Sequence, residues 1–410
     1  MNGPARNALM SVEDALALML RGARPVADVE SIATVAAAGR VLAVPVVSTV
    51  DVPPLDNTAM DGYAVRAAEC ASGSARLRVG QRIPAGALGR PLEPGTAARI
   101  FTGAPIPPGA DAVVPQEQTE ADGDHVIVRH APRTGEWIRR AGEDIRAGAE
   151  ILPAGTRLRP QEIGLAASAG LARVTVRRRV RAALFSTGNE LVMPGEPLPP
   201  GAIYNSNRYT LTGLLESLGC EVIDLGIVPD TLAATREAIR RAAAAADVIV
   251  TSGGVSVGEE DHLKPAVEAE GRLDMWKIAM KPGRPLAYGS VRRGDGTEAA
   301  FIGLPGNPVS SFVTFVLVVR PFVLELSGAA RRASAGYAMR AEFDWTKPDT
   351  RREFLRARIG AEGGVEVFPN QSSGVLTSTV WGDGLIDNPG GHAIARGDIV
   401  RFLPFAELLS

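Results

Sequence analysis

Residues 247–261 read Asp-Val-Ile-Val-Thr-Ser-Gly-Gly-Val-Ser-Val-Gly-Glu-Glu-Asp. An apolar run rich in β-branched residues passes directly into small and polar residues, a pattern typical of a buried strand followed by a loop. Residues 181–190 and 299–310 show the same change. Further strand-like runs lie at 221–227 and 286–291, and helical patterns lie at about 208–218, 233–245, 263–269 and 309–326. This alternation predicts a central three-layer α/β domain with a mostly parallel sheet and helices on both faces.

The segments on either side of this domain have a different texture. From residue 41 to about residue 153, short β-type runs are interrupted by Gly and Pro, which predicts an inserted N-terminal all-β domain. After Gly328 the alternation stops, and short runs at 339–343, 353–359, 364–368 and 399–402 predict a small C-terminal β-domain. The expected fold class is therefore multidomain, α/β plus β.

Composition excludes several classes of protein. The chain has 410 residues, 45% of them hydrophobic and 22% charged, with a formal net charge of −2. These values exclude a largely disordered chain, and they argue against nucleic acid or a membrane surface as a partner. Two distant cysteines and four scattered histidines match no zinc-site spacing. The start of the chain does not have the pattern of a secretory signal, and the longest apolar run, 312–319, is short for a membrane-spanning helix. We expect a soluble, cytoplasmic protein.

Three loops that follow predicted strands carry the candidate ligand-binding residues. Ligands of open α/β sheets collect beyond the carboxyl ends of the strands, where backbone N–H groups and helix N-termini attract anions. Neither a dinucleotide-binding Gly-x-Gly-x-x-Gly motif nor a P-loop is present. The alternative is that these glycines only satisfy turn geometry. The candidates are Thr187 and Gly188; Ser252, Gly253, Gly254 and Ser256; and Pro305, Gly306, Asn307 and Pro308.

Charged side chains lie near the same strand ends. If residues 277–281 are extended, Lys277 and Lys281 point to one face, where they suit an oxyanion or a polyphosphate; a solvated cluster is the alternative. Carboxylates beside a phosphate site usually hold Mg²⁺. Asp230 has the alternative of capping the next helix, and Glu190 that of standing in a first helical turn. The candidate carboxylates are Glu190, Asp230, Glu259, Glu260 and Asp261.

Motifs along essentially the whole chain resemble the molybdopterin molybdenumtransferase family (MoeA and the C-terminal part of gephyrin). Their order and number make the resemblance specific. They are Asp-Asn-Thr-Ala-Met-Asp-Gly-Tyr-Ala-Val (56–65), Thr-Gly-Ala-Pro (102–105) with Gly-Ala-Asp-Ala-Val-Val (109–114), Gly-Glu-Asp-Ile (142–145), Ser-Thr-Gly-Asn-Glu-Leu (186–191), Ser-Gly-Gly-Val-Ser-Val-Gly (252–258), Lys-Pro-Gly (281–283) and Leu-Pro-Gly-Asn-Pro-Val-Ser (304–310).

The resemblance implies an elongated four-part subunit and a homodimer. The expected parts are a helical and extended linker domain (1–28 and 147–177), an N-terminal β-rich domain (29–146), a molybdopterin-binding α/β domain (178–328) and a C-terminal β-barrel domain (329–410). It also implies the reaction: molybdate and adenylylated molybdopterin give molybdenum cofactor and AMP, assisted by Mg²⁺. The molybdopterin adenylyltransferase and recipient molybdoenzymes are implied as further partners.

The functional positions of the family fall on particular residues of this chain. The implied metal ligands are Glu190, Asp230 and Asp261. The chain departs from the family at Asn189, where relatives often have Asp, and at Asp230-Thr231, where relatives carry an acidic pair. The implied functional residues are Asp61, Thr102 and Asp144 in the N-terminal half, Glu190, Asp230, Asp261, Lys277 and Lys281 in the α/β domain, and Arg356 and Ser373 in the last domain.

Other functions remain open from the sequence. One alternative is an adenylyltransferase that charges molybdopterin with ATP, which is similar chemistry. The chain resembles such adenylyltransferases in its α/β part alone. A binding or scaffolding protein without turnover, and a paralogue that acts on a different oxyanion, are further alternatives.

Overall fold

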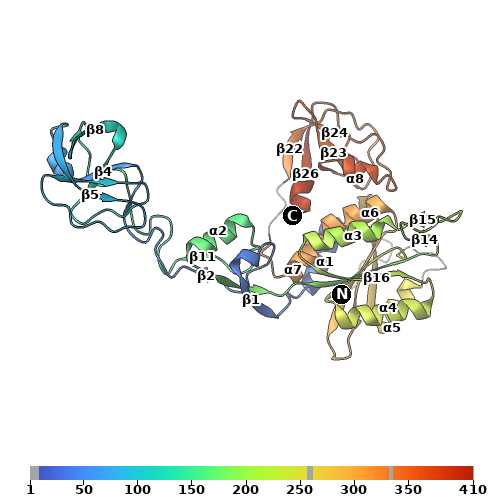
Figure 1. Ribbon diagram of the computed structural model, residues 1–410. Coiled ribbons are helices and arrows are strands. Elements are labelled where there is room, and N and C mark those ends of the chain that lie inside the picture. Colours follow the sequence, from blue (N-terminus) through green and yellow to red (C-terminus); the bar gives the residue numbers. More distant parts are fainter. Residues whose placement is uncertain (1–8, 256–261, 332–335, 410) are drawn as a thin grey trace.

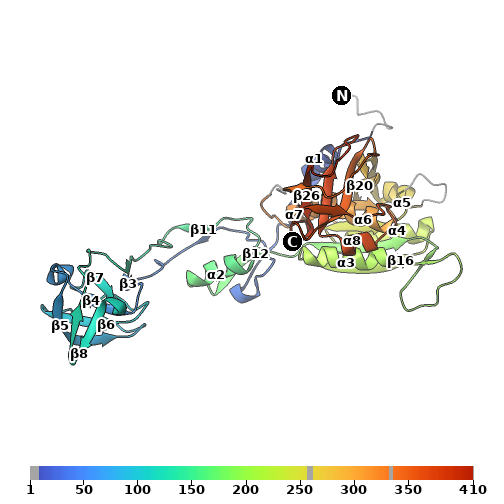
Figure 2. The same cartoon turned by 90° about the horizontal axis from the view of Figure 1, so that it is seen from above.

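The computed structural model describes residues 9–255, 262–331 and 336–409 of the chain. The molecule is elongated. An N-terminal β-domain lies at one end, and the α/β domain and the C-terminal domain lie together at the other, with an extended linker part between them (Figures 1 and 2).

The α/β domain is built on a six-stranded sheet in the order β16-β13-β17-β21-β20-β18. The pairs β13–β16, β13–β17 and β17–β21 are parallel, and the pairs β20–β21 and β18–β20 are antiparallel. This confirms the mostly parallel sheet. The strands are β13 (Arg181–Thr187), β16 (Glu221–Val228), β17 (Val248–Ser252), β18 (Gly271–Lys277), β20 (Pro285–Arg292) and β21 (Glu298–Leu304).

Helices cover both faces of this sheet. Leu211, Val313 and Phe322 belong to the core on one face, and Ile239 and Val267 belong to the core on the other. The first face carries α1 (Val12–Gly22), α3 (Ser206–Ser217), α6 (Pro308–Thr314), the π-helical segment η4 (Phe315–Val319) and α7 (Arg320–Leu326); the second carries α4 (Leu232–Ala245) and α5 (Leu263–Glu270).

The helical stretch Pro308–Leu326 passes, among the described residues, a test of length and apolarity for crossing a membrane. Its most apolar window is 72% buried inside the molecule. The apolarity of this stretch is thus explained by its place in the core of the α/β domain.

The linker part pairs two segments that are far apart in sequence. Antiparallel pairing joins β1 (Val29–Ala33) to β12 (Arg173–Arg177) and β2 (Val46–Val47) to β11 (Glu150–Leu152). The helix α2 (Pro160–Ser168) and the short turn η1 (Thr34–Ala36) pack on a small core with these strands.

The N-terminal helix does not follow the expected division, which placed residues 1–28 in the linker domain. Helix α1 begins after its N-cap Ser11, whose side chain accepts a hydrogen bond from Asp14 N at 3.0 Å. Its apolar stripe of Val12, Ala15 and Met19 is buried in the core of the α/β domain, where α1 contacts α7. The structure therefore groups α1 with the α/β domain, because that face had to be covered, and it groups β1 with the linker.

The N-terminal β-domain holds a six-stranded sheet in the order β7-β4-β6-β5-β9-β8. Apolar residues form a separate core on each side of the sheet. Its elements are β4 (Gly62–Val65), η2 (Ala67–Cys70), β5 (Ala75–Ile83), β6 (Thr96–Ile100), β7 (Ala112–Pro115), η3 (Gln116–Gln118), β8 (Thr119–Asp122) and β9 (His125–Val128), and the small pair β3 (Asn57–Thr58) and β10 (Ile138–Arg139) lies beside them.

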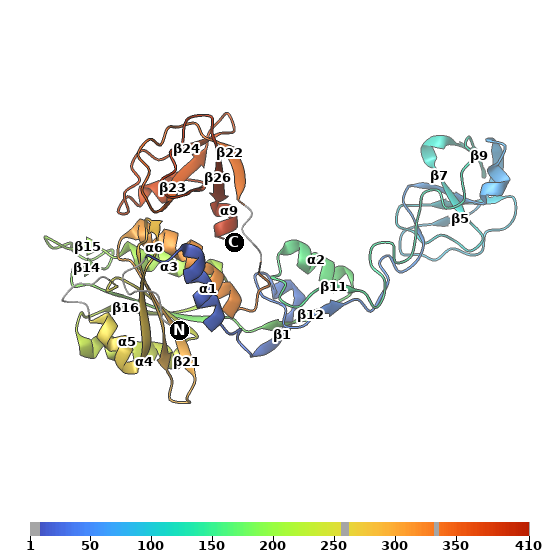
Figure 3. The same cartoon turned by 180° about the vertical axis from the view of Figure 1, so that it is seen from behind.

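The C-terminal domain is a small β structure above α6 (Figure 3). Its sheet has the order β19-β23-β25-β26-β22, and β24 pairs with β23. A bridge between Ala341 and Val365 brings the β22 edge to β24 and closes the sheet, as expected for a barrel. The elements are β19 (Met280–Lys281), β22 (Tyr337–Arg340), β23 (Arg352–Ile359), β24 (Val365–Val367), α8 (Thr377–Trp381), β25 (Gly384–Asn388), β26 (Ile399–Pro404) and α9 (Phe405–Leu408).

Candidate functional site

The three predicted loops lie at one edge of the α/β sheet. Strands β13, β17 and β21 are parallel neighbours, and Ser252 pairs in register with Ser186 on one side and Leu304 on the other. The loops that begin after residues 187, 252 and 304 therefore leave the sheet at the same level. We call this place the strand-end edge; ligands of open α/β sheets bind at such edges.

Glycines let these loops touch one another. Gly253 has φ +94°, and a Cβ there would stand 2.8 Å from the Thr187 carbonyl oxygen. A Cβ on Gly306 would lie 3.8 Å from Gly253 Cα. A side chain at Gly253 would push the loops apart, so turn geometry and close approach both require glycine there, whereas the contact at Gly306 is an ordinary van der Waals distance.

Asn207 on α3 ties the edge together and was not predicted as a functional residue. Its Nδ2 donates to Ser252 Oγ at 2.6 Å and to the Gly306 carbonyl oxygen at 2.7 Å. Two Asn residues, Asn205 and Asn207, stand in the first turn region of α3. Two asparagines so close together were the signal in the sequence that could have identified Asn207. Asn205 is explained as the N-cap of α3, because its side chain accepts a hydrogen bond from Arg208 N at 3.2 Å, whereas capping does not explain Asn207.

Several buried polar atoms at this edge lack partners. Ser186 Oγ, Thr251 Oγ1 and Asn205 Nδ2 are buried, and each lacks a hydrogen-bond partner within the described part of the chain. Buried polar groups are normally hydrogen-bonded, so unpaired ones point to a missing water or ligand. The strand-end edge is thus suited to bind a polar molecule.

The two described carboxylate candidates follow neighbouring strands. Glu190 is exposed and follows β13; its carboxylate lies against Gly188, where a Cβ would meet it at 2.6 Å. Asp230 is half-buried and follows β16. The capping alternative for Asp230 is wrong, because Thr231 is the N-cap of α4 and accepts from Ala234 N at 3.3 Å.

The remaining candidates that follow β17 in the sequence are three acidic residues and Ser256. Asp261, Glu259, Glu260 and Ser256 lie outside the described residues. Within residues 9–255, 262–331 and 336–409, no group of three His, Cys, Asp or Glu side chains is arranged to hold a metal ion.

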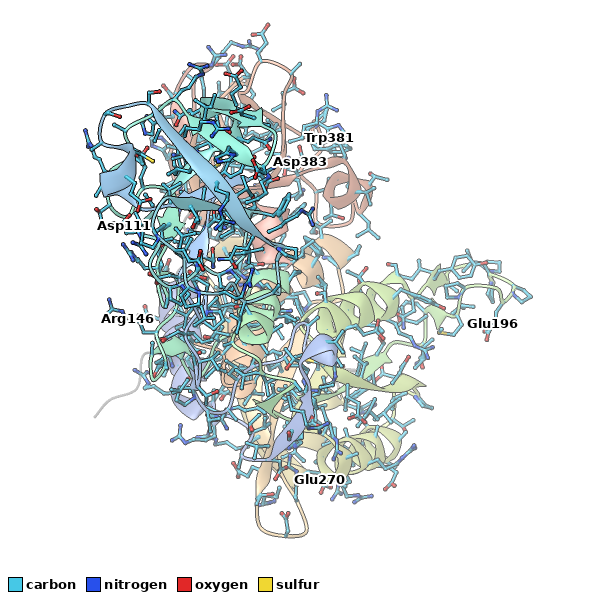
Figure 4. The ribbon with its side chains drawn as sticks, turned by 60° about the vertical axis from the view of Figure 1, so that its left-hand side comes forward. Asp111, Arg146, Glu196, Glu270, Trp381 and Asp383 are labelled. Carbon is cyan, nitrogen blue, oxygen red and sulfur yellow. The ribbon has the colours of Figure 1, made fainter. Side chains whose placement is uncertain are left out.

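A loop projects from the strand-end edge between β14 (Leu191–Val192) and β15 (Ile203–Tyr204), which pair in parallel. Figure 4 shows Glu196 near the far end of this projection. The Tyr204 hydroxyl donates to the Glu196 carbonyl oxygen at 3.0 Å and thus braces the loop.

The two lysines do not share one extended strand. Lys277 ends β18 of the α/β sheet, Ala279 stands in a bend, and Lys281 pairs with Glu353 in the sheet of the C-terminal domain. Lys281 Nζ lies 3.2 Å from Glu353 Oε1 and 3.5 Å from Asp349 Oδ2. Lys277 is half-buried and has no ion-pair partner among the residues that the structure describes. The argument from side-chain period therefore fails, because the bend interrupts the strand.

Arg356 is the largest fully buried side chain of the described residues, with an exposure of 1%. Its guanidinium donates to Ser378 Oγ at 3.1 Å and to the carbonyl oxygens of Phe354 and Ser372 at 3.3 Å. Burial without a carboxylate lowers its pKa to about 10. The adjacent Ser373 accepts a hydrogen bond from Val309 N at 3.0 Å through its carbonyl oxygen. The last domain thus brings a desolvated cation next to the loop before α6.

The three N-terminal candidates lie elsewhere. Asp61 Oδ1 accepts from Thr102 N at 2.8 Å and from Thr102 Oγ1 at 2.7 Å, and these bonds lower the pKa of Asp61. Asp144 is exposed, and its backbone N–H donates to the Val52 carbonyl oxygen at 3.0 Å. Asp61 stands directly before β4 and Thr102 shortly after β6, and both strands belong to the N-terminal β-domain, which lies at the opposite end of the molecule from the α/β domain (Figure 1).

Comparison with known families covers nearly the whole chain. Residues 10–170 match the MoeA N-terminal region (domain I and II), residues 183–325 match a probable molybdopterin binding domain, and residues 338–405 match the MoeA C-terminal region (domain IV). The chain belongs to the MoeA family. The resemblance inferred from the motifs is therefore confirmed.

Individual MoeA relatives are similar over similar lengths. A molybdopterin molybdenumtransferase of Haemophilus influenzae is 37% identical over 381 residues, which cover 91% of this chain and 93% of that protein. A molybdopterin molybdenumtransferase of Nostoc is 40% identical over 334 residues, covering 80% and 76%. The crystal structure of a molybdopterin biosynthesis MoeA protein from Pyrococcus horikoshii has a TM-score of 0.81 at 28% identity and covers 96% of this chain and 99% of that one.

Proposed function

We propose that this chain is a molybdopterin molybdenumtransferase, which inserts molybdate into adenylylated molybdopterin and releases AMP. The observation that supports this most is the strand-end edge. Three glycine-bearing loops converge there, and buried polar atoms beside them have no hydrogen-bond partner among the described residues. The chain is also similar over most of its length to molybdopterin molybdenumtransferases. Backbone N–H groups at this edge would bind phosphate oxygens.

The cationic side chains near the strand-end edge would offset the negative charge of molybdate and of the substrate phosphates. Molybdate is a dianion, and the ligand that it approaches already carries phosphates. Lys277 is free of carboxylate partners among the described residues, and Arg356 is desolvated, so each would attract an oxyanion strongly. Lys281 is different, because Glu353 and Asp349 already neutralise it. We assign the main electrostatic role to Lys277 and Arg356, and a shared role to Lys281.

Magnesium is a further part of the proposal. Glu190 and Asp230 offer hard oxygen ligands after adjacent strands, and neither forms an ion pair with a described Lys or Arg. Mg²⁺ needs only one or two protein carboxylates together with substrate phosphates, so this donor set fits it. Glu190 and Asp230 would hold the ion, with Asp261 as a further proposed ligand. The ion would offset charge on the phosphates as the bond to AMP breaks.

We also propose a homodimer. Five exposed valines lie on or beside the linker part, namely Val29, Val35, Val44, Val47 and Val50, and Val35 is 87% exposed. These side chains would supply apolar area for contact with a second copy of the chain. A dimer would also bring Asp61, Thr102 and Asp144 of one chain to the strand-end edge of the other. The two free, buried cysteines, Cys70 and Cys220, agree with a proposed place in the reducing cytoplasm.

The proposed reaction is tested by supplying the purified chain with adenylylated molybdopterin, with and without molybdate, and measuring AMP. We expect AMP release that depends on molybdate. Formation of adenylylated molybdopterin from molybdopterin and ATP would instead identify an adenylyltransferase. Tight binding of the adenylylated ligand without AMP release would identify a binding protein.

A further inference from the structure

An arginine and aromatic cluster stands on the N-terminal β-domain, outside the residues considered so far. Tyr63 on β4 pairs in register with Arg99 on β6, and Arg99 pairs with Arg82 on β5. Cross-strand partners share a face of the sheet, and Phe101 stands two residues after Arg99 on the same side. We call Tyr63, Arg82, Arg99 and Phe101 the arginine face.

Each guanidinium of the arginine face lies over a ring. The Arg82 Cζ lies 4.4 Å from the centre of the Phe101 ring, and the Arg99 Cζ lies 4.7 Å from the same ring and 5.2 Å from that of Tyr63. Five arginine–ring contacts occur among the described residues, and three of them fall here. Because such contacts normally occur about once per 70–80 residues, this concentration is local and not a general property of the chain.

Stacking on the rings fixes the planes of both guanidinium groups, and it leaves the N–H edge of Arg82 available to a planar oxyanion. Arg99 donates to the Gly62 carbonyl oxygen at 3.0 Å and to Gln116 Oε1 at 2.7 Å. Arg82 is exposed, and no described carboxylate or hydrogen-bond acceptor contacts it. Arg76 and Arg78 on the same strand, by contrast, pair with Asp122 and Glu93.

The arginine face adjoins Asp61 and Thr102. Arg99 contributes to the lowered pKa of Asp61, and Thr102 directly follows Phe101. Asp61 brings one negative charge against the two positive charges of Arg82 and Arg99, and its hydrogen bonds from Thr102 leave that charge unchanged. A positive charge therefore remains beside an exposed hydroxyl, which favours an anion with several oxygens.

We propose that Arg82 and Arg99 bind a phosphate group, and that this group is the nucleotide phosphate of the adenylylated substrate or of the AMP product. The identity of that carrier rests on the proposed function; the phosphate chemistry does not. Stacking on Phe101 and Tyr63 presents two guanidinium edges in a fixed geometry, so little side-chain entropy is lost on binding.

The test is protection of arginines from phenylglyoxal on the full chain, read for each residue by mass spectrometry. AMP and inorganic pyrophosphate should each slow modification of Arg82 and Arg99 at least threefold, and adenosine should not. Arg90, exposed in the same domain, is the control and should react at an unchanged rate. Protection by both anions, or by AMP alone, supports binding of the nucleotide phosphate, whereas protection by pyrophosphate without protection by AMP would overturn that assignment.

Unchanged modification of Arg82 with both anions would overturn the proposal, as would protection by a poly-glutamate peptide alone. In turnover, Arg82→Gln should raise the KM for the adenylylated substrate at least threefold with kcat little changed, and Arg76→Gln should leave both unchanged. An inactive wild type that still shows protection would refute the proposed function and leave the phosphate site standing. Protection that is lacking in an active enzyme would refute the phosphate site alone.

Discussion

Trp137 has a backbone conformation that its side chain does not favour. It has φ +57°, the left-handed region, and it is the one non-glycine residue with a positive φ within the described ranges. Its carbonyl oxygen accepts a hydrogen bond from Ala59 N at 2.9 Å, which fixes it beside the loop that carries Asp61. The strain at this position is of order 1 kcal/mol or more.

We expect Trp137→Asn to stabilise the chain by about 1 kcal/mol, because Asn tolerates this conformation and the indole is 44% exposed. Urea denaturation measures the change. Trp137→Phe keeps an aromatic ring and the strain, so it should give no gain; a gain from both variants would refute the backbone explanation.

Some single residues could be predicted from the sequence, and others could not. The position of Ser252 at the end of a strand follows from the local pattern, and β17 does end there. The partners of Lys281 and the role of Asn207 could not be predicted, because Glu353 and Gly306 are distant in sequence and nothing local indicates them.

At the scale of elements, Thr231 starts α4 and Asp230 stands one residue before it. Thr231→Ala should cost about 1 kcal/mol of stability, since the cap bond to Ala234 N is lost. Asp230→Ala should leave stability nearly unchanged and reduce magnesium-dependent AMP release. Urea denaturation and the AMP assay, applied to both variants, separate the capping role of Thr231 from the magnesium role of Asp230. A large loss of stability in Asp230→Ala would contradict this assignment.

Asp247 joins the start of β17 to the end of the linker part. Its carboxylate accepts hydrogen bonds from Arg178 Nη1 at 2.7 Å, from Arg178 Nη2 at 2.9 Å and from Arg181 N at 2.8 Å. Although burial opposes them, these bonds lower the pKa of Asp247 in the folded chain. A lowered folded pKa gives stability that is present above the unfolded value of about 3.9 and is lost as the pH falls through the folded value.

We therefore expect Asp247→Asn to destabilise the chain by about 2 kcal/mol at pH 7, a cost typical of breaking hydrogen bonds to a charged group. The difference in the free energy of unfolding between variant and wild type should become smaller as the pH falls below about 4. Urea denaturation at several pH values measures it. A gap that is constant from pH 7 to pH 3 would show that the ionised carboxylate is not the cause.

The central sheet was predictable because each apolar run and the loop after it are local features. The interruption at Ala279 was not predicted, since residues 277–281 contain no local break before Pro282 and the change of sheet depends on the C-terminal domain. The place of α1 likewise depends on which distant surface covers its apolar face.

At the scale of the whole molecule, the proposed dimer predicts a mass in solution of twice that of one chain, measured by light scattering after gel filtration. Val35→Asp combined with Val47→Asp should shift the protein to monomer, because both side chains are exposed on the linker part. Leu88→Asp, at a 78% exposed position of the N-terminal β-domain, is the control and should leave the mass unchanged. A wild-type monomer would contradict the dimer.

The elongated shape could be expected only from the family resemblance. The linker is formed by pairing segments more than a hundred residues apart, such as Val29 with Arg177, and no sequence periodicity reports such pairing. The separation of Asp61 from the strand-end edge likewise depends on this long-range pairing, because Asp61 directly precedes β4 in the sheet of the N-terminal β-domain.

The most direct test of the account is AMP release by Lys277→Ala at saturating adenylylated molybdopterin and molybdate, beside the charge-matched control Lys264→Ala on α5. Lys264 is exposed and lies 4.0 Å from Glu268 on the same helix. Loss of one cation that stabilises the reacting anions typically costs about a hundredfold in rate. We predict that loss for Lys277→Ala with the fold intact, and a change within about twofold for Lys264→Ala, which removes the same charge from a solvated surface. Normal turnover by Lys277→Ala would contradict the assignment of the reaction to the strand-end edge.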